Sequence, residues 1–359
     1  MRVLRATMIG LVMLHGIEAG SALAQRIFWT QAVETPKEDD RIELRSARLD
    51  GTDVQTLLVI EDARLPSGIT LDLFEGRVYF AIECADECTS GVWRVNLDGN
   101  RSERIIEVPV VGIDIDPVAR KLYFVTWVEP EGRRIWRSNL DGSDRQPLVT
   151  ANVRGLALDL VHRKMYWTTW IERNLVRANL DGSNVELIAE FDGVSGFVSV
   201  DALAGYVYWP AGATVQRCDL DGSNKQSTQA INRISAYKGI AIDPRESSGD
   251  VYLTTWYDFR SSQRQIVRFA EQRCFDNGRC WFDDIVDLPV ASREVGDLAI
   301  DLWGRGQGLS LGDLDPLTDC LAGPDVDRTT ECFTSDYDGD GRIDLFDFAL
   351  LQRHAEPSR

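Results

Sequence analysis

Short apolar stretches that end in aspartate recur between residues 26 and 301. In each stretch apolar and small residues alternate, and turn-forming residues follow the aspartate. Stretches this short and this punctuated are typical of β-strands rather than of helices. The six copies are Gly68–Asp72, Gly112–Asp116, Gly155–Asp159, Phe197–Asp201, Gly239–Asp243 and Asp297–Asp301.

Two further patterns accompany these stretches in a fixed order. The first is an aromatic pair that follows the aspartate, and the second is a strand that ends in a Leu-Asp-Gly turn, where glycine tolerates positive φ. The aromatic copies are Phe28–Trp29, Tyr79–Phe80, Tyr123–Phe124, Tyr166–Trp167, Tyr208–Trp209 and Tyr252–Leu253. The strand-and-turn copies are 92–99, 135–142, 175–182 and 215–222, with partial copies at 49–51 and 266–269.

The three patterns together repeat with a period of roughly 40 to 45 residues, which is typical of a propeller blade. The first aromatic pair has no apolar stretch before it, and the last apolar stretch has no aromatic pair after it. Joined, the two ends would complete one blade and leave no open sheet edge. We therefore expect an all-β, six-bladed propeller over residues 25–301, with a closing blade shared by the two ends. An open solenoid is the alternative.

The ordered motifs Gly-x-Ala-x-Asp, Tyr-Trp-Thr-x and Ile-x-Arg-x-x-Leu-Asp-Gly resemble the class B (YWTD) repeats of low-density-lipoprotein-receptor-type propellers. The resemblance implies a ligand-binding or scaffold propeller. In that family the aspartate of YWTD helps to tie neighbouring blades together, but no blade keeps it here, so we expect a different polar bracing. The residues at its position are Gln31, Ile82, Thr126, Thr169, Ala211 and Thr255.

Acidic residues at fixed intervals near the C-terminus predict a calcium loop over residues 336–347. Carboxylates occupy positions 1, 3, 5, 9 and 12, with Gly341 at position 6 and Ile343 at position 8. This twelve-residue spacing wraps oxygen ligands around Ca²⁺. The expected ligands are Asp336, Asp338, Asp340, the backbone carbonyl of Arg342, Asp344 directly or through water, and Asp347.

Aspartate at position 12, with no evident helix before the loop, resembles type I dockerins, which carry two loop–helix units. The upstream candidate, around 302–324, lacks the carboxylates, so we expect one functional Ca²⁺ site in a small α-helical calcium-loop domain, 302–359. The resemblance implies a cohesin-like partner. Leu345 and Phe346, at the positions that often choose that partner, are more apolar than usual, so packing of the module on itself is the alternative.

The N-terminus predicts export. Arg2 and Arg5 precede a short apolar run, and Ala22–Ala24 forms a small-residue cleavage site, as in a secretory signal. We expect a signal peptide over 1–24, cleavage after Ala24, and a secreted, periplasmic or cell-envelope protein. The run is too short to span a bilayer, and no later stretch is apolar enough to do so.

Charge and cysteines narrow the picture. With 39 Lys and Arg against 57 Asp and Glu, the chain carries a net charge of −18, which argues against a nucleic-acid partner. Six of the seven cysteines form close pairs suited to disulfides in an exported protein: Cys84 with Cys88, Cys274 with Cys280, and Cys320 with Cys332. Zinc binding is the alternative, but only three histidines are available. We expect the remaining Cys218 to be buried.

Trp127, Trp170 and Trp256 each lie four residues after a blade tyrosine. If the aromatic strands end on one face, these side chains would anchor a protein or carbohydrate ligand there; packing between blades is the alternative. We expect no enzyme, because the propeller holds only His162, in a turn, and because Asp114 suits a structural hydrogen bond. The alternatives are an exported hydrolase or lyase acting on a lactone or polysaccharide, and a purely structural component.

Overall fold

The computed structural model describes residues 26–33, 40–73, 75–84, 88–128, 132–202, 204–228, 234–242, 250–258, 265–270, 275, 283–287 and 292–301. The expected signal peptide, the calcium loop 336–347 with its ligands, and the rest of segment 302–359 lie outside these residues. The cysteine pairs Cys274–Cys280 and Cys320–Cys332 lie outside them as well.

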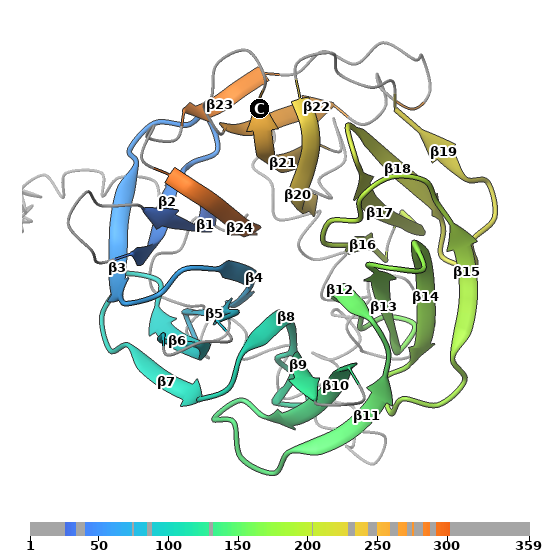
Figure 1. The fold of residues 1–359 in the computed structure, drawn as a ribbon, viewed down its shortest axis with the longest axis horizontal. Coiled ribbons are helices and arrows are strands. Elements are labelled where there is room, and N and C mark those ends of the chain that lie inside the picture. The colour runs from blue at the N-terminus through green and yellow to red at the C-terminus, as the bar shows by residue number, and fades with distance from the viewer. Residues whose placement is uncertain are drawn as a thin grey trace, which may run out of the picture.

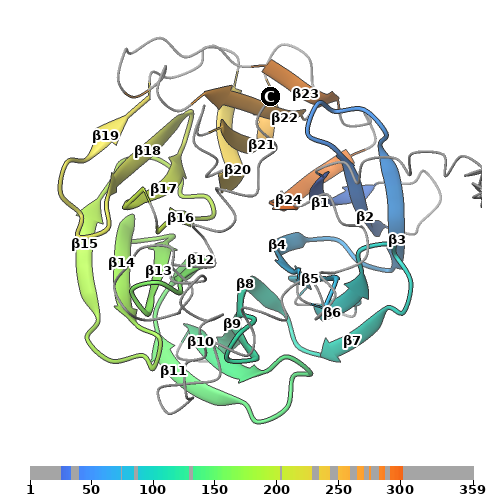
Figure 2. The ribbon, with the colours of Figure 1, turned by 180° about the vertical axis from the view of Figure 1, so that it is seen from behind.

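Six four-stranded antiparallel sheets are arranged in a ring, as Figures 1 and 2 show from opposite sides. Blade 1 is β24 (Ser292–Asp301), β1 (Arg26–Val33), β2 (Arg41–Arg48) and β3 (Gln55–Glu61); blade 2 is β4 (Pro66–Asp72), β5 (Arg77–Ile82), β6 (Gly91–Asn96) and β7 (Glu103–Ile106). Blade 3 is β8 (Val110–Asp116), β9 (Lys121–Val128), β10 (Gly132–Asn139) and β11 (Gln146–Thr150); blade 4 is β12 (Val153–Asp159), β13 (Lys164–Thr169), β14 (Asn174–Asn179) and β15 (Glu186–Glu190). Blade 5 is β16 (Ser199–Asp201), β17 (Tyr206–Ala211), β18 (Thr214–Asp219) and β19 (Gln226–Ser227); blade 6 is β20 (Ile234–Ile242), β21 (Asp250–Asp258), β22 (Gln265–Ala270) and β23 (Asp283–Asp287).

Blade 1 closes the ring with strands from both ends of the repeat region. β24 pairs antiparallel with β1, so that Asp301 lies opposite Arg26 and Leu298 lies opposite Trp29. The predicted six-bladed propeller and its shared closing blade are confirmed, and the open solenoid is wrong.

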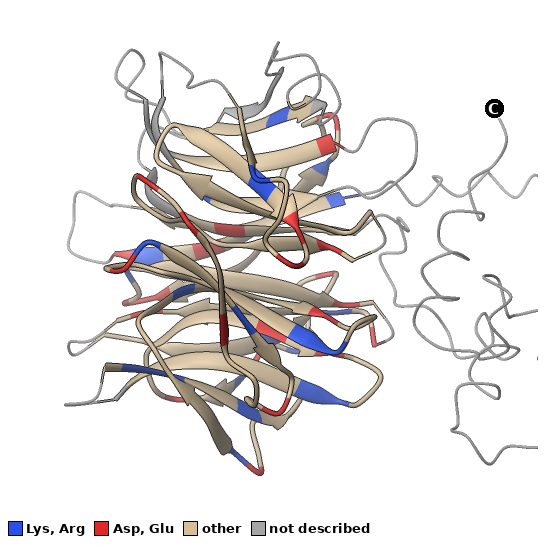
Figure 3. Ribbon diagram, turned by 90° about the vertical axis from the view of Figure 1, so that its right-hand side faces the viewer, with Lys and Arg blue, Asp and Glu red and all other residues tan. Residues whose placement is uncertain are grey.

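The aromatic pairs form the core between adjacent blades. Tyr79 in blade 2 belongs to the same apolar cluster as Ile113 and Phe124 in blade 3, and all three are buried. Burial of each such side chain contributes on the order of 2 kcal/mol. Charged residues gather toward the strand ends and turns, while the strands are otherwise mainly uncharged (Figure 3). The sheets therefore hold together through apolar faces that meet between blades.

Glycines let the innermost strands approach one another closely. A Cβ on Gly68 would lie 2.8 Å from the amide nitrogen of Ile113, and one on Gly155 would lie 2.5 Å from Cα of Phe197. In both cases the obstacle is backbone of the next blade, which cannot move aside as a side chain can. Gly68 and Gly155 are thus packing requirements of the ring.

Polar contacts also brace neighbouring blades. The buried carboxylates that end the innermost strands are reached by arginines of the following blade: Arg120 Nη1 lies 3.4 Å from Asp72 Oδ2, and Arg163 Nη1 lies 2.8 Å from Asp116 Oδ2. The buried Thr168 Oγ1 donates to the carbonyl of Gly196, in the link to the next blade, at 2.8 Å. These contacts supply the polar bracing that the sequence predicts between blades.

Candidate functional site

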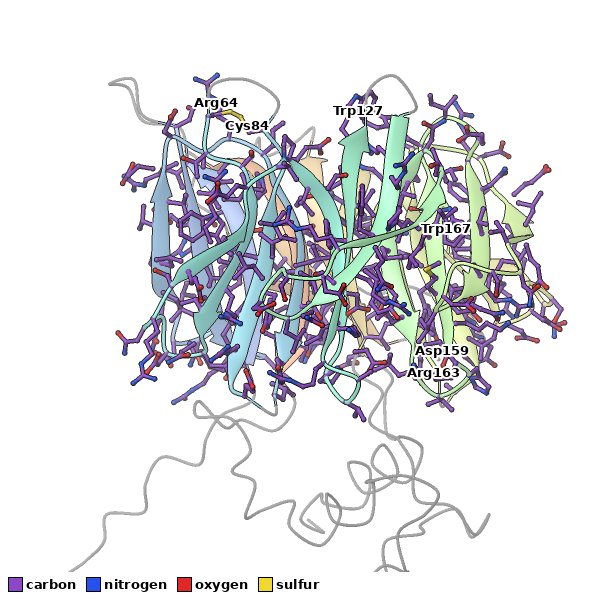
Figure 4. All side chains as sticks on the ribbon, turned by 90° about the horizontal axis from the view of Figure 1, so that it is seen from below. Arg64, Cys84, Trp127, Asp159, Arg163 and Trp167 are labelled. Carbon is purple, nitrogen blue, oxygen red and sulfur yellow. A yellow bond between two sulfur atoms is a disulfide. The ribbon has the colours of Figure 1, made fainter. Side chains whose placement is uncertain are left out.

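The two faces of the disc differ in chemistry. Figure 4 shows Arg64, Cys84 and Trp127 at one face and Asp159 with Arg163 at the other. We call the first the Trp face; it carries the turns between the second and third strands and the links that enter each innermost strand. The opposite Asp face carries the turns that follow each innermost strand and the Asp-Gly turns.

Exposed apolar side chains concentrate on the Trp face over blades 3 and 4. Trp127 is 52% exposed, Trp170 is 48% exposed and the adjacent Ile171 is 74% exposed. Trp127 lies near the end of β9 and Trp170 directly follows β13, the equivalent strand of the next blade, so the two emerge on the same face rather than being buried between blades. For Trp256 the structure describes only the backbone, within β21. Further exposed apolar residues in the links of this face are Leu65, Val108 and Val194.

Two arginines hold the tryptophans in place. The guanidinium carbon of Arg133 lies 5.6 Å from the ring centre of Trp127 and 5.5 Å from that of Trp170. The guanidinium carbon of Arg154 lies 4.9 Å from the Trp170 ring centre. Each such contact stabilises the pair by about 0.5 to 2 kcal/mol. The result is a preorganised array of two tryptophans and two arginines.

Hydrogen bonds fix Arg133 within this array. It is buried, and it donates from Nη1 to the carbonyl of Val153 at 2.7 Å and from Nη2 to Glu83 Oε1 at 2.7 Å. Burial lowers the pKa of the Arg133 guanidinium, and the Glu83 carboxylate opposes that shift. The loop that carries Glu83 is closed by the disulfide between Cys84 and Cys88, a pair that the sequence predicts. Blades 2, 3 and 4 therefore position the tryptophans together.

The central channel holds a second group of polar side chains around a cavity of about 190 Å³. Asp114 Oδ1 accepts hydrogen bonds from Thr70 Oγ1 at 2.9 Å and from its neighbour's amide, and Oδ2 accepts from the amide of Leu158 at 2.8 Å. Asp114 thus joins blades 2, 3 and 4. Asp297, which sequence reasoning missed, accepts from the amide of Ile240 at 3.0 Å and joins blades 1 and 6.

Burial dominates the electrostatics of the channel. It raises the pKa of Asp114 to about 6, although three hydrogen bonds oppose the shift. Burial also raises the pKa of Asp297 well above its ordinary value, and the charge of Asp114 adds to that effect. Backbone amides hold both carboxylates, which is the structural role expected of Asp114. The signal for Asp297 was visible in the sequence, because it stands where four other blades have glycine.

The remaining reactive residue types lie apart from both sites. Cys218 is fully buried in β18, as predicted, and burial raises the pKa of its thiol to about 12. His162 lies in the turn between β12 and β13, with Nδ1 2.9 Å from Asp159 Oδ2. Within the described part of the chain, neither residue faces the channel or the tryptophans.

Comparisons with known proteins support the fold. No family model matches the chain, and no curated protein matches it. Among solved structures, a chain in a crystal structure of a nidogen–laminin complex is similar, with a TM-score of 0.63 and 16% identity. The match covers 78% of this chain and 99% of that one. The two share the propeller fold.

Among the described residues, no helix is long and apolar enough to cross a membrane.

Proposed function

We propose that this protein is an exported, non-enzymatic propeller that binds a protein ligand on its Trp face. The observation that carries the proposal is the half-exposed pair Trp127 and Trp170, immobilised by Arg133 and Arg154. Rigid, exposed aromatic residues are the usual anchors of protein interfaces, because little side-chain entropy is lost when they bind.

A protein ligand fits this surface better than a carbohydrate. Sugars stack on open ring faces, whereas guanidinium groups already lie over the rings of Trp127 and Trp170. Near the half-exposed rings lie the exposed Ile171 and a polar pair in which Asn152 Nδ2 donates to Glu172 Oε1 at 2.7 Å. An apolar centre inside a polar rim is the general layout of a protein interface. The similar fold found in a complex of nidogen with laminin is compatible with this role.

The double replacement Trp127→Ala/Trp170→Ala is expected to weaken ligand binding at least tenfold, since central aromatic anchors carry much of the binding energy. The full chain is used as bait in the native exported fraction, the captured protein is identified, and its affinity for each variant is measured by interferometry. Val185→Ala/Leu187→Ala, which removes exposed apolar residues from the outer edge of blade 4, is the control. Equal affinities for wild type and the tryptophan variant would refute the proposed surface.

The C-terminal segment 302–359 completes the proposal as a calcium-stabilised, dockerin-like module that attaches the propeller to a cohesin-like partner. Its support is the carboxylate spacing of the loop 336–347, whose oxygen donors suit Ca²⁺. The charged, apolar and small-residue pattern over residues 1–24 supports export of a mature chain that would begin at Gln25. A module this small has little apolar core of its own, so bound metal would contribute to its folding.

Calcium titration of the chelator-treated full chain is expected to reveal one bound ion, measured by isothermal calorimetry. The variant Asp338→Ala/Asp340→Ala is expected to lose that ion, because two of the ligand carboxylates disappear. Asp181→Ala, in an exposed Asp-Gly turn of blade 4, serves as the control and should bind like wild type. Unchanged calcium uptake by the loop variant, or no uptake by wild type, counts against the module.

A further inference from the structure

A groove of about 660 Å³ opens on the Asp face at the junction of blades 4 and 5. One wall comes from β13 and β14 of blade 4, with Lys164, Tyr166 and Arg177. The other comes from blade 5, with Gly205 in the turn after β16 and Asp219 at the end of β18. The groove lies on the face opposite the tryptophans and is independent of the function proposed above.

Comparison with the preceding blades shows which side chain occupies this position elsewhere. The fourth residue after the terminal aspartate of the innermost strand is Arg120 in blade 3 and Arg163 in blade 4. Both have left-handed backbone, with φ of 56° and 54°. Each reaches back to the buried aspartate of the preceding blade, Asp72 or Asp116. An arginine therefore fills this position at the junctions of blades 2 with 3 and 3 with 4.

In blade 5 the equivalent residue is Gly205, as it is Gly76 in blade 2, so neither blade supplies the arginine. Gly205 has φ of +80°, and a Cβ built on it would have no atom within 4 Å. The aspartate that such an arginine would meet, Asp159, is 0% exposed like its counterparts. Its Oδ2 is instead 2.9 Å from Nδ1 of His162, a side chain that is 50% exposed. Rotation of His162 into solvent would open that oxygen to the groove.

The walls of the groove are more acidic than those of its counterpart. At the junction of blades 3 and 4 the corresponding residues are Lys121, Tyr123 and Arg137 on one side and Asn179 on the other. At the junction of blades 4 and 5 the asparagine is replaced by Asp219. The cationic wall residues Lys164 and Arg177 do not exclude an arginine ligand. Arg163 occupies the preceding junction although Lys121 and Arg137 stand at the same positions there. The groove thus lacks one positive charge and gains one negative charge.

We propose that this groove binds an arginine side chain of a protein partner. The guanidinium would take the position that Arg163 holds at the preceding junction, pairing with Asp159 and drawn in by Asp219. A planar guanidinium suits this role better than an ammonium, because its fork of N–H donors matches the geometry of a carboxylate.

The ligand test uses N-acetylarginine amide as the probe and the full chain as the target, followed by calorimetry or NMR. A dissociation constant on the order of 1 mM is expected for so small a ligand. N-acetylcitrulline amide, which has the same shape without the charge, should bind at least tenfold more weakly. Equal binding of the two probes, or no arginine binding well above that concentration, would overturn the proposal.

Gly205→Arg supplies the missing side chain from the protein itself. It is expected to weaken binding of the probe at least tenfold and to raise Tm by about 1 to 3 °C relative to Gly205→Gln, which has the same backbone strain without the charge. Gly212→Arg is the matched control, because Gly212 also has positive φ and open space around its Cβ but lies on the Trp face. Undiminished probe binding by Gly205→Arg, or a Tm no higher than that of Gly205→Gln, would overturn the proposal.

Discussion

Gly222→Ala is expected to destabilise the propeller by about 3 kcal/mol or more. Gly222 ends the Asp-Gly turn of blade 5 with φ of +88°, and a Cβ there would overlap the carbonyl oxygen of Ile188 in β15 of blade 4. That oxygen belongs to a strand backbone, so the collision cannot be relieved by a rotamer change. The variant must either separate the two blades or distort the turn.

Gly205→Ala is the control that separates the steric collision at Gly222 from the cost of placing alanine in left-handed backbone. Gly205 has a similar φ of +80° but open space around its Cβ, so the same replacement is expected to cost only about 1 kcal/mol. Urea unfolding of both variants measures the difference. Equal losses of stability would mean that backbone conformation alone accounts for these glycines, and that the close approach of neighbouring blades contributes nothing.

The repeat made most of the fold predictable from the sequence. Its apolar, aromatic and turn motifs each correspond to one strand or turn of every blade, and the unmatched ends at Phe28–Trp29 and Asp297–Asp301 indicated how the ring closes. Even the glycine pattern carries information about inter-blade distance, because Gly99, Gly142, Gly182 and Gly222 all meet backbone or side chain of the preceding blade. A repeat specifies contacts that every blade makes with its neighbour.

Features that break the repeat were harder to predict. The spacing placed Trp127 and Trp170 at equivalent strand ends, but their stacking on Arg133 depends on how far apart two blades lie at that face. The same is true of the link from Arg133 to Glu83, which joins residues 50 positions apart. The open groove had only a partial signal: Gly205 stands in line with Arg120 and Arg163. Blade 2 also has a glycine there, Gly76, so the sequence did not single out this junction; the structure shows the groove and the buried aspartate beside it.

Lowering the pH from 7 to about 4 is expected to stabilise the folded propeller, through Asp114, by up to about 3 kcal/mol. The pKa of Asp114 is about 6 in the folded protein, against an ordinary value of 3.8. The folded state therefore binds a proton at a higher pH than the unfolded state does, and stability rises as pH falls through 6, until the unfolded carboxyl also protonates. Asp297 acts in the same direction, because its pKa is raised too.

The charges around the carboxyl support this direction. Asp116 on the same strand raises the pKa of Asp114, and the charge of Asp114 raises that of Asp297 from across the channel. Lys238 opposes the shift at Asp297, but burial is the larger cause there. Exposed turn aspartates such as Asp141 have lowered pKa values, so they lose their stabilising contacts only below about pH 4. Between about pH 4 and 6 the change in folding stability therefore comes from the channel carboxyls.

Asp114→Asn tests this assignment, because an amide keeps the shape of the side chain but removes its titration. It also turns one acceptor into a donor that faces the amide of Leu158, so some stability is lost at every pH. The informative quantity is therefore the change in urea midpoint between pH 7 and pH 5, which should be smaller than that of wild type, with Asp297 supplying the rest. The double variant Asp114→Asn/Asp297→Asn should be nearly flat, and Asp141→Asn should follow wild type. If Asp114→Asn keeps the full wild-type change, the pH dependence originates outside the channel, and the carboxyl that joins blades 2, 3 and 4 is already ionised at pH 5.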